Sequence, residues 1–316
     1  MITPITNPSA INYWLNEALS PEPFLTYTDL SLSETASADI MRDAKIFHID
    51  PPIALLYSKD SYRRRQKEIS PHVLGNMHLC NFVKLTESLY IISPETAFLL
   101  EARHRTLPEL VNLACNLCAI YKPDPFSPYG QIKRAQITTV SSITDYLSGL
   151  HNMPGGRKAR QAIAYALDNS NSPMESIFAA IFRLPFFLGG GDIFDISLNR
   201  KSYLTPNAAE FLGRDYCTCD ISSNLRKVVF EYDSNLTHLN PDQHSYDKKR
   251  ATALQMSGYS VFTITASDLK DHLSLDKMLL SAREALGLRT HYDRFNKYRD
   301  IRWNTYNQLI FKRHRF

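Results

Sequence analysis

Between positions 227 and 233, apolar residues stand at 228, 230 and 232 and charged residues at 227, 231 and 233, and this period of two, interrupted only by Val229, predicts a strand. Successive side chains of a strand point to opposite faces, so one face should be apolar and pack in a core. That face would consist of Val228, Phe230 and Tyr232. The opposite face would carry Lys227, Val229, Glu231 and Asp233. Two carboxylates on one strand face are costly to bury alone, and a divalent cation such as Mg²⁺ is a partner that stabilises them.

The pattern around this strand predicts a small mixed sheet flanked by helices. The expected strands cover residues 193–198, 217–221, 227–233 and 259–265, and the expected helices cover 173–184, 246–257 and 266–286. Ser172-Pro173-Met174-Glu175 opens the first helix with residue types that are typical of a helix N-terminus. Taken alone, this pattern favours a capping role for Glu175. Gly189-Gly190-Gly191 lacks the Lys-Ser/Thr of a phosphate-binding loop, so we expect a flexible turn there.

The first half of the chain predicts an α+β domain. Residues 1–45 are rich in Pro, Ser and Thr, and we expect them to form an irregular arm with a short helix near 10–19. Strands are expected at 52–57, 82–85 and 89–92, followed by helices at 94–103, 107–120, 139–150 and 156–167. The chain therefore divides into the arm, an α+β domain over 46–170, an α/β domain over 171–288 and a tail over 289–316.

The composition is that of an ordinary globular protein, with 44% hydrophobic and 22% charged residues. No stretch resembles a membrane span or a signal peptide, so we expect a cytoplasmic protein. Five cysteines, an odd number without a signal peptide, predict free thiols rather than disulfides or a zinc site. The net charge of +4 permits binding to a polyanion without requiring it.

Basic and aromatic residues alternate in the tail. Basic residues neutralise phosphates and aromatic rings stack on unpaired bases, so we predict DNA contacts from Arg302, Lys312 and Arg313. The alternative, which is compatible with the first, is an amphipathic helix that packs its aromatic side chains on the preceding domain. The basic run Arg63-Arg64-Arg65 with His72 is expected to be a solvated surface rather than a phosphate contact.

Six polar residues around the central strand follow a recognisable order. An acid precedes the strand, E-x-D ends it, a histidine comes soon after, and D-x-x-R lies on a helix: Asp220, Glu231, Asp233, His238, Asp247 and Arg250. This order resembles the PD-(D/E)XK nuclease superfamily, and more closely the endonuclease domains related to very-short-patch mismatch repair endonucleases. The resemblance implies a restriction-endonuclease-like mixed sheet and hydrolysis of a DNA phosphodiester that depends on Mg²⁺ or Mn²⁺. It also implies that Asp220, Glu231 and Asp233 hold the metal and that Glu175 points at it.

The chain departs from the family pattern in three places. Cys219 replaces the usual Pro, Asp233 stands at the position of the motif Lys, and Ser234 replaces a common Gly. The missing Lys leaves His238 and Lys227 as candidates for orienting or deprotonating the attacking water.

The helix after the strand carries Asp247-Lys248-Lys249-Arg250. Asp247 and Arg250 lie three residues apart on one helix face. They could hold His238, clamp a phosphate, or form an ion pair that pins the helix. Lys248 and Lys249, together with Lys227, are predicted DNA contacts.

The region before the nuclease-like domain resembles bacterial proteins of the AbiEi type. The features are a strand pair, a helix opened by Ser93-Pro94-Glu95, and Gly156-Arg157 before a later helix. AbiEi proteins are antitoxins and transcriptional repressors of abortive-infection systems that normally begin with a DNA-binding winged helix, and no winged helix is recognisable in residues 1–45. Two alternatives to a nuclease therefore stay open: a non-catalytic DNA-binding regulator with a toxin partner, and a protein-interaction module of a defence operon.

Overall fold

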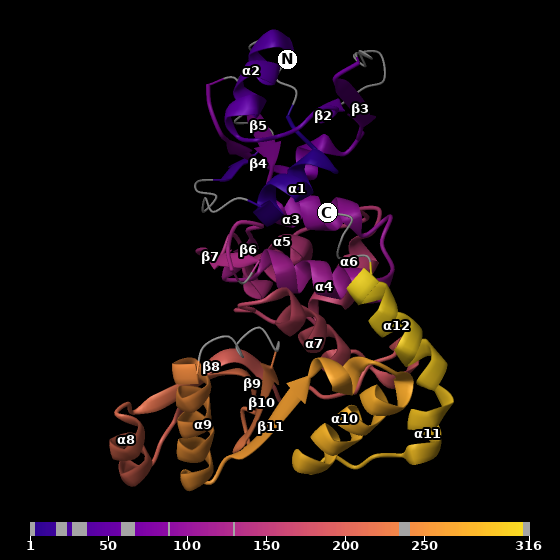
Figure 1. Ribbon diagram of the computed structural model, residues 1–316. Coiled ribbons are helices and arrows are strands. Elements are labelled where there is room, and N and C mark those ends of the chain that lie inside the picture. The colour runs from indigo at the N-terminus through magenta and orange to yellow at the C-terminus, as the bar shows by residue number, and fades with distance from the viewer. Residues whose placement is uncertain are drawn as a thin grey trace. The chain divides into compact units, whose positions relative to one another are not determined.

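The computed structural model describes residues 4–16, 24–26, 37–57, 67–87, 89–128, 130–233 and 241–311. Over these residues the chain divides into two compact units (Figure 1). The N-terminal unit comprises 4–126 and 130–164, and the C-terminal unit comprises 127–128 and 165–311. Both units combine helices with small sheets, so the chain is a mixed α/β protein as expected. The boundary falls six residues earlier than the predicted one at 170.

Short strands and helices alternate along the N-terminal unit. Its helices are α1 (Ser9–Asn16), α2 (Ser37–Ile46), α3 (Pro94–Glu101), α4 (Leu107–Leu117), α5 (Val140–Ser148) and α6 (Gly156–Ile163). Its strands are β1 (Phe24–Thr26), β2 (Ile53–Tyr57), β3 (Ile69–Val73), β4 (Asn81–Lys84), β5 (Tyr90–Ile92), β6 (Tyr121–Pro123) and β7 (Gln131–Lys133). β2 pairs with β3 in parallel, and the order β1-β4-β5 forms a three-stranded antiparallel sheet.

The start of the chain differs from the expected irregular arm. Ile5 is buried and bridges Leu55 of β2 and Ile91 of β5, so it links the two sheets. Trp14 of α1 is buried, and its indole Nε1 donates to the carbonyl of Ile92 at 2.9 Å. The buried Arg134 donates to the carbonyl of Trp14 at 2.7 Å. A few large apolar residues thus bury most of residues 4–16 in the core. The average composition of the segment does not indicate this burial.

Helix starts in this unit follow the predicted capping chemistry. Ser93 caps α3 by accepting from the amide of Thr96, and Pro94 takes the first helical position. Thr106 and Glu109 form a reciprocal capping box at the start of α4. All five cysteines of the chain are buried free thiols, as predicted.

The C-terminal unit is built on one four-stranded mixed sheet. The strands are β8 (Ser197–Tyr203), β9 (Tyr216–Ser222), β10 (Val228–Asp233) and β11 (Ser260–Thr265), in the order β11-β10-β9-β8. β10 and β11 are parallel, whereas β8, β9 and β10 pair in antiparallel fashion. The helices are α7 (Pro173–Arg183), α8 (Pro206–Leu212), α9 (Pro241–Met256), α10 (His272–Ala285), α11 (Tyr292–Lys297) and α12 (Arg299–Phe311).

Helices cover both faces of β10, as its alternating pattern predicts. On one face, Phe230 meets Phe182 of α7 with ring centroids 5.3 Å apart, and Tyr232 meets Phe178 of α7 at 5.5 Å. On the other face, Val229 is buried in a cluster with residues of α8 and α9: Ala208, Leu212, Ala253 and Leu254. Figure 1 shows α8 and α9 beside the sheet. Glu231 therefore faces α9.

Two elements of this unit differ from the sequence-based expectation. The first strand, expected at 193–198, runs over Ser197–Tyr203. Its segment Arg200-Lys201 is exposed because β8 is the edge strand of the sheet, so its pattern lacks the apolar alternation of a central strand. The short helix α8 was not predicted, although Pro206 at its start and Gly213 after its end follow ordinary helix-boundary preferences.

The three glycines at 189–191 serve close packing. A Cβ on Gly189 would lie 2.8 Å from the Cα of Arg302, and a Cβ on Gly190 would lie 1.8 Å from the carbonyl oxygen of Leu184. The lack of a side chain at Gly189 lets α12 approach this turn closely, and the lack of one at Gly190 makes room for Leu184. The expected flexible turn is thus a tightly packed contact.

Among the described residues, no helix combines the length and the apolar character needed to cross a bilayer.

Candidate active site

The sheet opens between β9 and β10 at Asp220. Its two strands pair at Val229–Ser222 and Phe230–Ile221, and the ladder stops there. Two residues beyond Phe230 on β10, the amide of Tyr232 donates to the Asp220 carboxylate at 2.8 Å. A side chain thus takes the place of a backbone partner, so the strands separate where the acidic residues lie.

The edge strand is distorted at the same level. The β8–β9 ladder skips Asn199, between the pairs Leu198–Ile221 and Arg200–Cys219, and Asn199 has a left-handed backbone with φ of 49°. Val229 and Ser222 share a face, so strict alternation along β9 would place Asp220 on that face too. Cys219, however, is the residue that joins the buried cluster of Val229. The alternation therefore shifts by one residue near Asp220, as it does at a bulge, and this re-aims the side chain.

Glu175 takes the capping role considered for it, and its carboxylate also reaches β8. Ser172 caps α7 by accepting from the Glu175 amide at 3.2 Å. The carboxylate is buried and accepts from the amide of Asn171 at 2.8 Å and from the side chain of Asn199 at 2.5 Å. Asn199 thereby ties the start of α7 to the distorted part of β8, next to Asp220.

Glu231 forms an ion pair with Arg250 of α9, with Nη2 and Oε1 2.5 Å apart. Arg250 also donates to the carbonyl of Thr218 at 3.3 Å and lies 4.0 Å from Asp247. Of the three roles considered for Asp247 and Arg250, the structure places Arg250 in an ion pair that pins α9 to the sheet.

Charge in this cluster is unbalanced. Burial and the nearby carboxylates of Glu231 and Glu175 raise the pKa of Asp220 well above its ordinary range. Burial also raises the pKa of Glu175, although hydrogen bonds from Asn171 and Asn199 act against the shift. Burial opposes the charge of Arg250, but the neighbouring Glu231 carboxylate raises the pKa of Arg250 overall. Glu231, Asp220 and Asp247 thus share the guanidinium of Arg250, and Glu175 adds a buried carboxyl group that accepts from Asn171 and Asn199.

Asp220, Glu231 and Glu175 form this cluster, whereas Asp233 extends past it. Asp233 is the last residue of β10 and lies opposite Thr265 of β11. Across the part of the chain that the structure describes, no three His, Cys, Asp or Glu side chains are arranged to hold one metal ion together. His238 lies outside the described residues.

The predicted DNA contacts have different surroundings. Lys227 is exposed at the far end of β10, and its ammonium donates to the carbonyl of Ser257 at 2.8 Å, at the C-terminal end of α9. Lys248 and Lys249 are exposed on α9. The Lys249 ammonium lies 5.2 Å from the ring centroid of Phe211.

Arg302 does not meet the expectation that it contacts DNA. Its side chain is 0% exposed, donates to Asp276 at 2.7 Å, and stacks 3.6 Å above the ring centroid of Phe295. The tail helices α11 and α12 therefore supply core residues, so the packing alternative holds for this part of the tail. Lys312 and Arg313 lie outside the described residues.

Sequence reasoning missed Asn199. The residue type is one signal, because Asn adopts left-handed backbone conformations more readily than most residues. That signal does not specify which carboxylate the side chain binds.

Comparison of the chain with protein-family models, with curated proteins and with solved structures gave no match, so the interpretation of this site rests on its own geometry.

Proposed function

We propose that the C-terminal unit is a metal-dependent DNA endonuclease domain with a restriction-endonuclease-like fold. The observation that carries the proposal is the excess of carboxylates where β9 and β10 separate. Asp220 and Glu231 share the single guanidinium of Arg250, and Glu175 adds a third carboxyl group. A buried excess of negative charge is destabilising unless a proton or a cation compensates it.

The donor set fits Mg²⁺ or Mn²⁺. These ions prefer carboxylate oxygens, and Mg²⁺ is commonly bound by one or two carboxylates together with water and substrate phosphate. Asp220 and Glu231 would hold the ion, so a set of three protein ligands is not required. When bound, the metal would polarise the scissile phosphate and lower the pKa of a bound water.

The surrounding residues would position the two carboxylates. The Tyr232 amide holds the Asp220 carboxylate at the strand opening. Arg250 holds Glu231 and, as a cation beside the cluster, would reduce its repulsion of phosphate. Lys227 is bound at the opposite end of β10, which leaves His238 as the predicted group that orients or deprotonates the water.

The Glu231–Arg250 ion pair also favours a second candidate, a non-catalytic DNA-binding regulator. An ion pair that already satisfies Glu231 holds α9 on the sheet without any metal. In that case the fold would serve binding alone, beside a toxin partner protein of the kind that AbiEi-type systems contain.

A cleavage assay separates the two candidates. Purified protein is incubated with supercoiled and with single-stranded DNA in the presence of Mg²⁺, Mn²⁺ or EDTA. We expect cleavage with either metal and none with EDTA. Glu231→Gln should abolish cleavage and leave DNA affinity equal or slightly higher, because it removes a metal ligand together with a charge that repels phosphate.

Glu210→Gln is the matched control, since Glu210 is an exposed carboxylate on α8 away from the strand opening. It should cleave like the parent protein. Absence of cleavage with every metal would favour the regulator. Cleavage by Glu231→Gln at the parental rate would refute the assignment of the site even for an active nuclease.

A further inference from the structure

The β8–β9 ribbon carries an exposed face beyond the candidate active site. Lys201 lies opposite Thr218 and Tyr203 lies opposite Tyr216, so these four side chains share one face. All four residues are exposed. Ser202 and its neighbours on the other face are buried against α8 and α9. The exposed face is therefore not covered by those helices.

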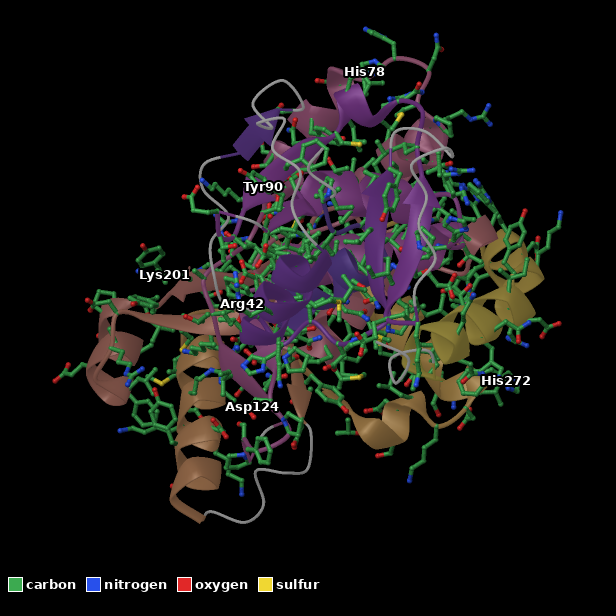
Figure 2. The ribbon with its side chains drawn as sticks, turned by 90° about the horizontal axis from the view of Figure 1, so that it is seen from above. Arg42, His78, Tyr90, Asp124, Lys201 and His272 are labelled. Carbon is green, nitrogen blue, oxygen red and sulfur yellow. The ribbon has the colours of Figure 1, made fainter. Side chains whose placement is uncertain are left out.

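Two tyrosines and a lysine form a compact group on this face. Tyr203 is 65% exposed and Tyr216 is 37% exposed, and their ring centroids lie 6.0 Å apart. The Lys201 ammonium lies 4.2 Å from the ring centroid of Tyr216. Figure 2 labels Lys201. Burying these rings against the protein would stabilise the fold, so two neighbouring exposed rings on an edge ribbon indicate a contact surface.

The group is aligned with the candidate active site along the same two strands. Lys201 is two residues from Asn199, and Tyr203 is four residues from it, which corresponds to roughly 7 and 14 Å along a strand. Tyr216 is likewise four residues from Asp220 along β9. A chain molecule bound along the ribbon would therefore lead to the strand opening.

We propose that this face binds single-stranded DNA and presents it to the strand opening. The bases would stack on Tyr203 and Tyr216, and Lys201 would neutralise a phosphate. Stacking requires exposed base faces, which a paired duplex does not offer along its length. The inference rests on the proposed function and names its substrate class as unpaired DNA.

The test measures binding in EDTA, where no cleavage takes place, by fluorescence anisotropy. One probe is an oligothymidylate of about 15 nucleotides and the other is an abasic oligomer of equal length and charge. The parent protein should bind the oligothymidylate more tightly. Tyr203→Ala and Tyr216→Ala should each weaken that binding by about 5- to 150-fold and bring it toward the abasic value.

Three further variants sharpen the test. Tyr203→Phe keeps the ring and should bind like the parent protein. Lys201→Gln should lower the slope of log affinity against log salt by about 0.7, the value for one phosphate contact of a single strand. Phe126→Ala removes an exposed ring, 96%, from the N-terminal unit, outside the tail and the β8–β9 ribbon, and should bind like the parent protein.

Parental binding by both alanine variants, or equal affinity of the parent protein for the two probes, would overturn the proposal. If the protein binds oligothymidylate through these tyrosines but never cuts DNA, the proposed nuclease function is refuted and the proposed binding surface is supported. If the parent protein cuts DNA and both alanine variants bind oligothymidylate with parental affinity, the proposed nuclease function is supported and the proposed binding surface is refuted.

Discussion

Two arginine–carboxylate clusters in the C-terminal unit have opposite charge balance. Asp276 accepts from Arg299 at 2.6 Å and from Arg302 at 2.7 Å, so one acid serves two arginines. Around Arg250 the ratio is reversed, because Glu231, Asp220 and Asp247 share its single charge. The first cluster joins α10 to α12, whereas the second lies where the sheet opens.

The difference separates a structural cluster from a candidate site. The Asp276 side chain is 6% exposed and accepts from both arginines, so protein groups pair this acid fully. In the Arg250 cluster, burial and neighbouring carboxylates raise the pKa of Asp220 and of Glu175. Functional sites commonly retain such unfavourable charge at a cost in stability.

The largest effect should follow from Asp276→Asn. This substitution leaves the fully buried Arg302 without a counter-charge, and we expect a loss of about 3–5 kcal/mol in the free energy of unfolding. Urea denaturation of the full chain measures it. Asp300→Asn, an exposed acid at the start of α12, should change stability by less than about 0.5 kcal/mol. Equal losses in both variants would contradict the structural role of the Asp276 cluster.

Arg250→Met should have an intermediate effect of about 1.5–3 kcal/mol, since it leaves Glu231 next to two other acids without a cation. The loss should be smaller than that of Asp276→Asn because Glu231 and Arg250 are 18% and 24% exposed. Lys248→Met on the same helix is the control and should be near neutral. A larger loss in the free energy of unfolding for Arg250→Met than for Asp276→Asn would contradict the assignment of the Asp276 cluster as the more stabilising of the two.

Asp220→Asn should stabilise the protein by about 0.5–2 kcal/mol at neutral pH while abolishing any cleavage. The folded state holds the Asp220 proton more tightly than the unfolded state, whose ordinary pKa is 3.8. In the parent protein this contribution to stability is therefore complete below pH 3.8 and is lost as pH rises through the folded pKa. Thermal melts from acidic to neutral pH should show the gain of Asp220→Asn growing with pH. A gain that does not depend on pH would contradict the raised pKa.

Arg299→Met should have the smallest effect, below about 1 kcal/mol. Arg299 is the outer partner of Asp276 and is 39% exposed, and Arg302 continues to bind the acid after the substitution. The same urea denaturation measures it. A loss comparable to that of Arg250→Met would show that the number of cations per acid does not govern the two clusters.

The sequence predicted the central parts of the C-terminal sheet because alternation along β10 is strong and both of its faces are buried. The edge strand β8 and the helix α8 were less accessible, since Arg200-Lys201 and the short segment Pro206–Leu212 carry little periodic signal. Residues 4–16 were mistaken for an arm because their composition outweighed the contribution of Ile5 and Trp14.

For the candidate site, the sequence placed Asp220 next to β10 and Glu231 on the face of β10 opposite Phe230 and Tyr232, and the structure agrees. It did not predict that Arg250 would take Glu231 as its partner or that Asn199 would bind Glu175, because both contacts join segments far apart in the chain. Arg302 was assigned to DNA by its tail composition, and tertiary packing overrides that signal. The nuclease assignment itself stays a prediction.

The hydrogen bond between the Tyr232 amide and the Asp220 carboxylate makes that amide a natural reporter of the site. Neighbouring amides of β10 are protected from hydrogen exchange by the strands on either side, and they exchange when the sheet opens. The Tyr232 amide is held by a single carboxylate, so its exchange rate depends on the ionisation and occupancy of that one group. Exchange at Tyr232 therefore records what binds to Asp220 while the rest of the sheet serves as its internal reference.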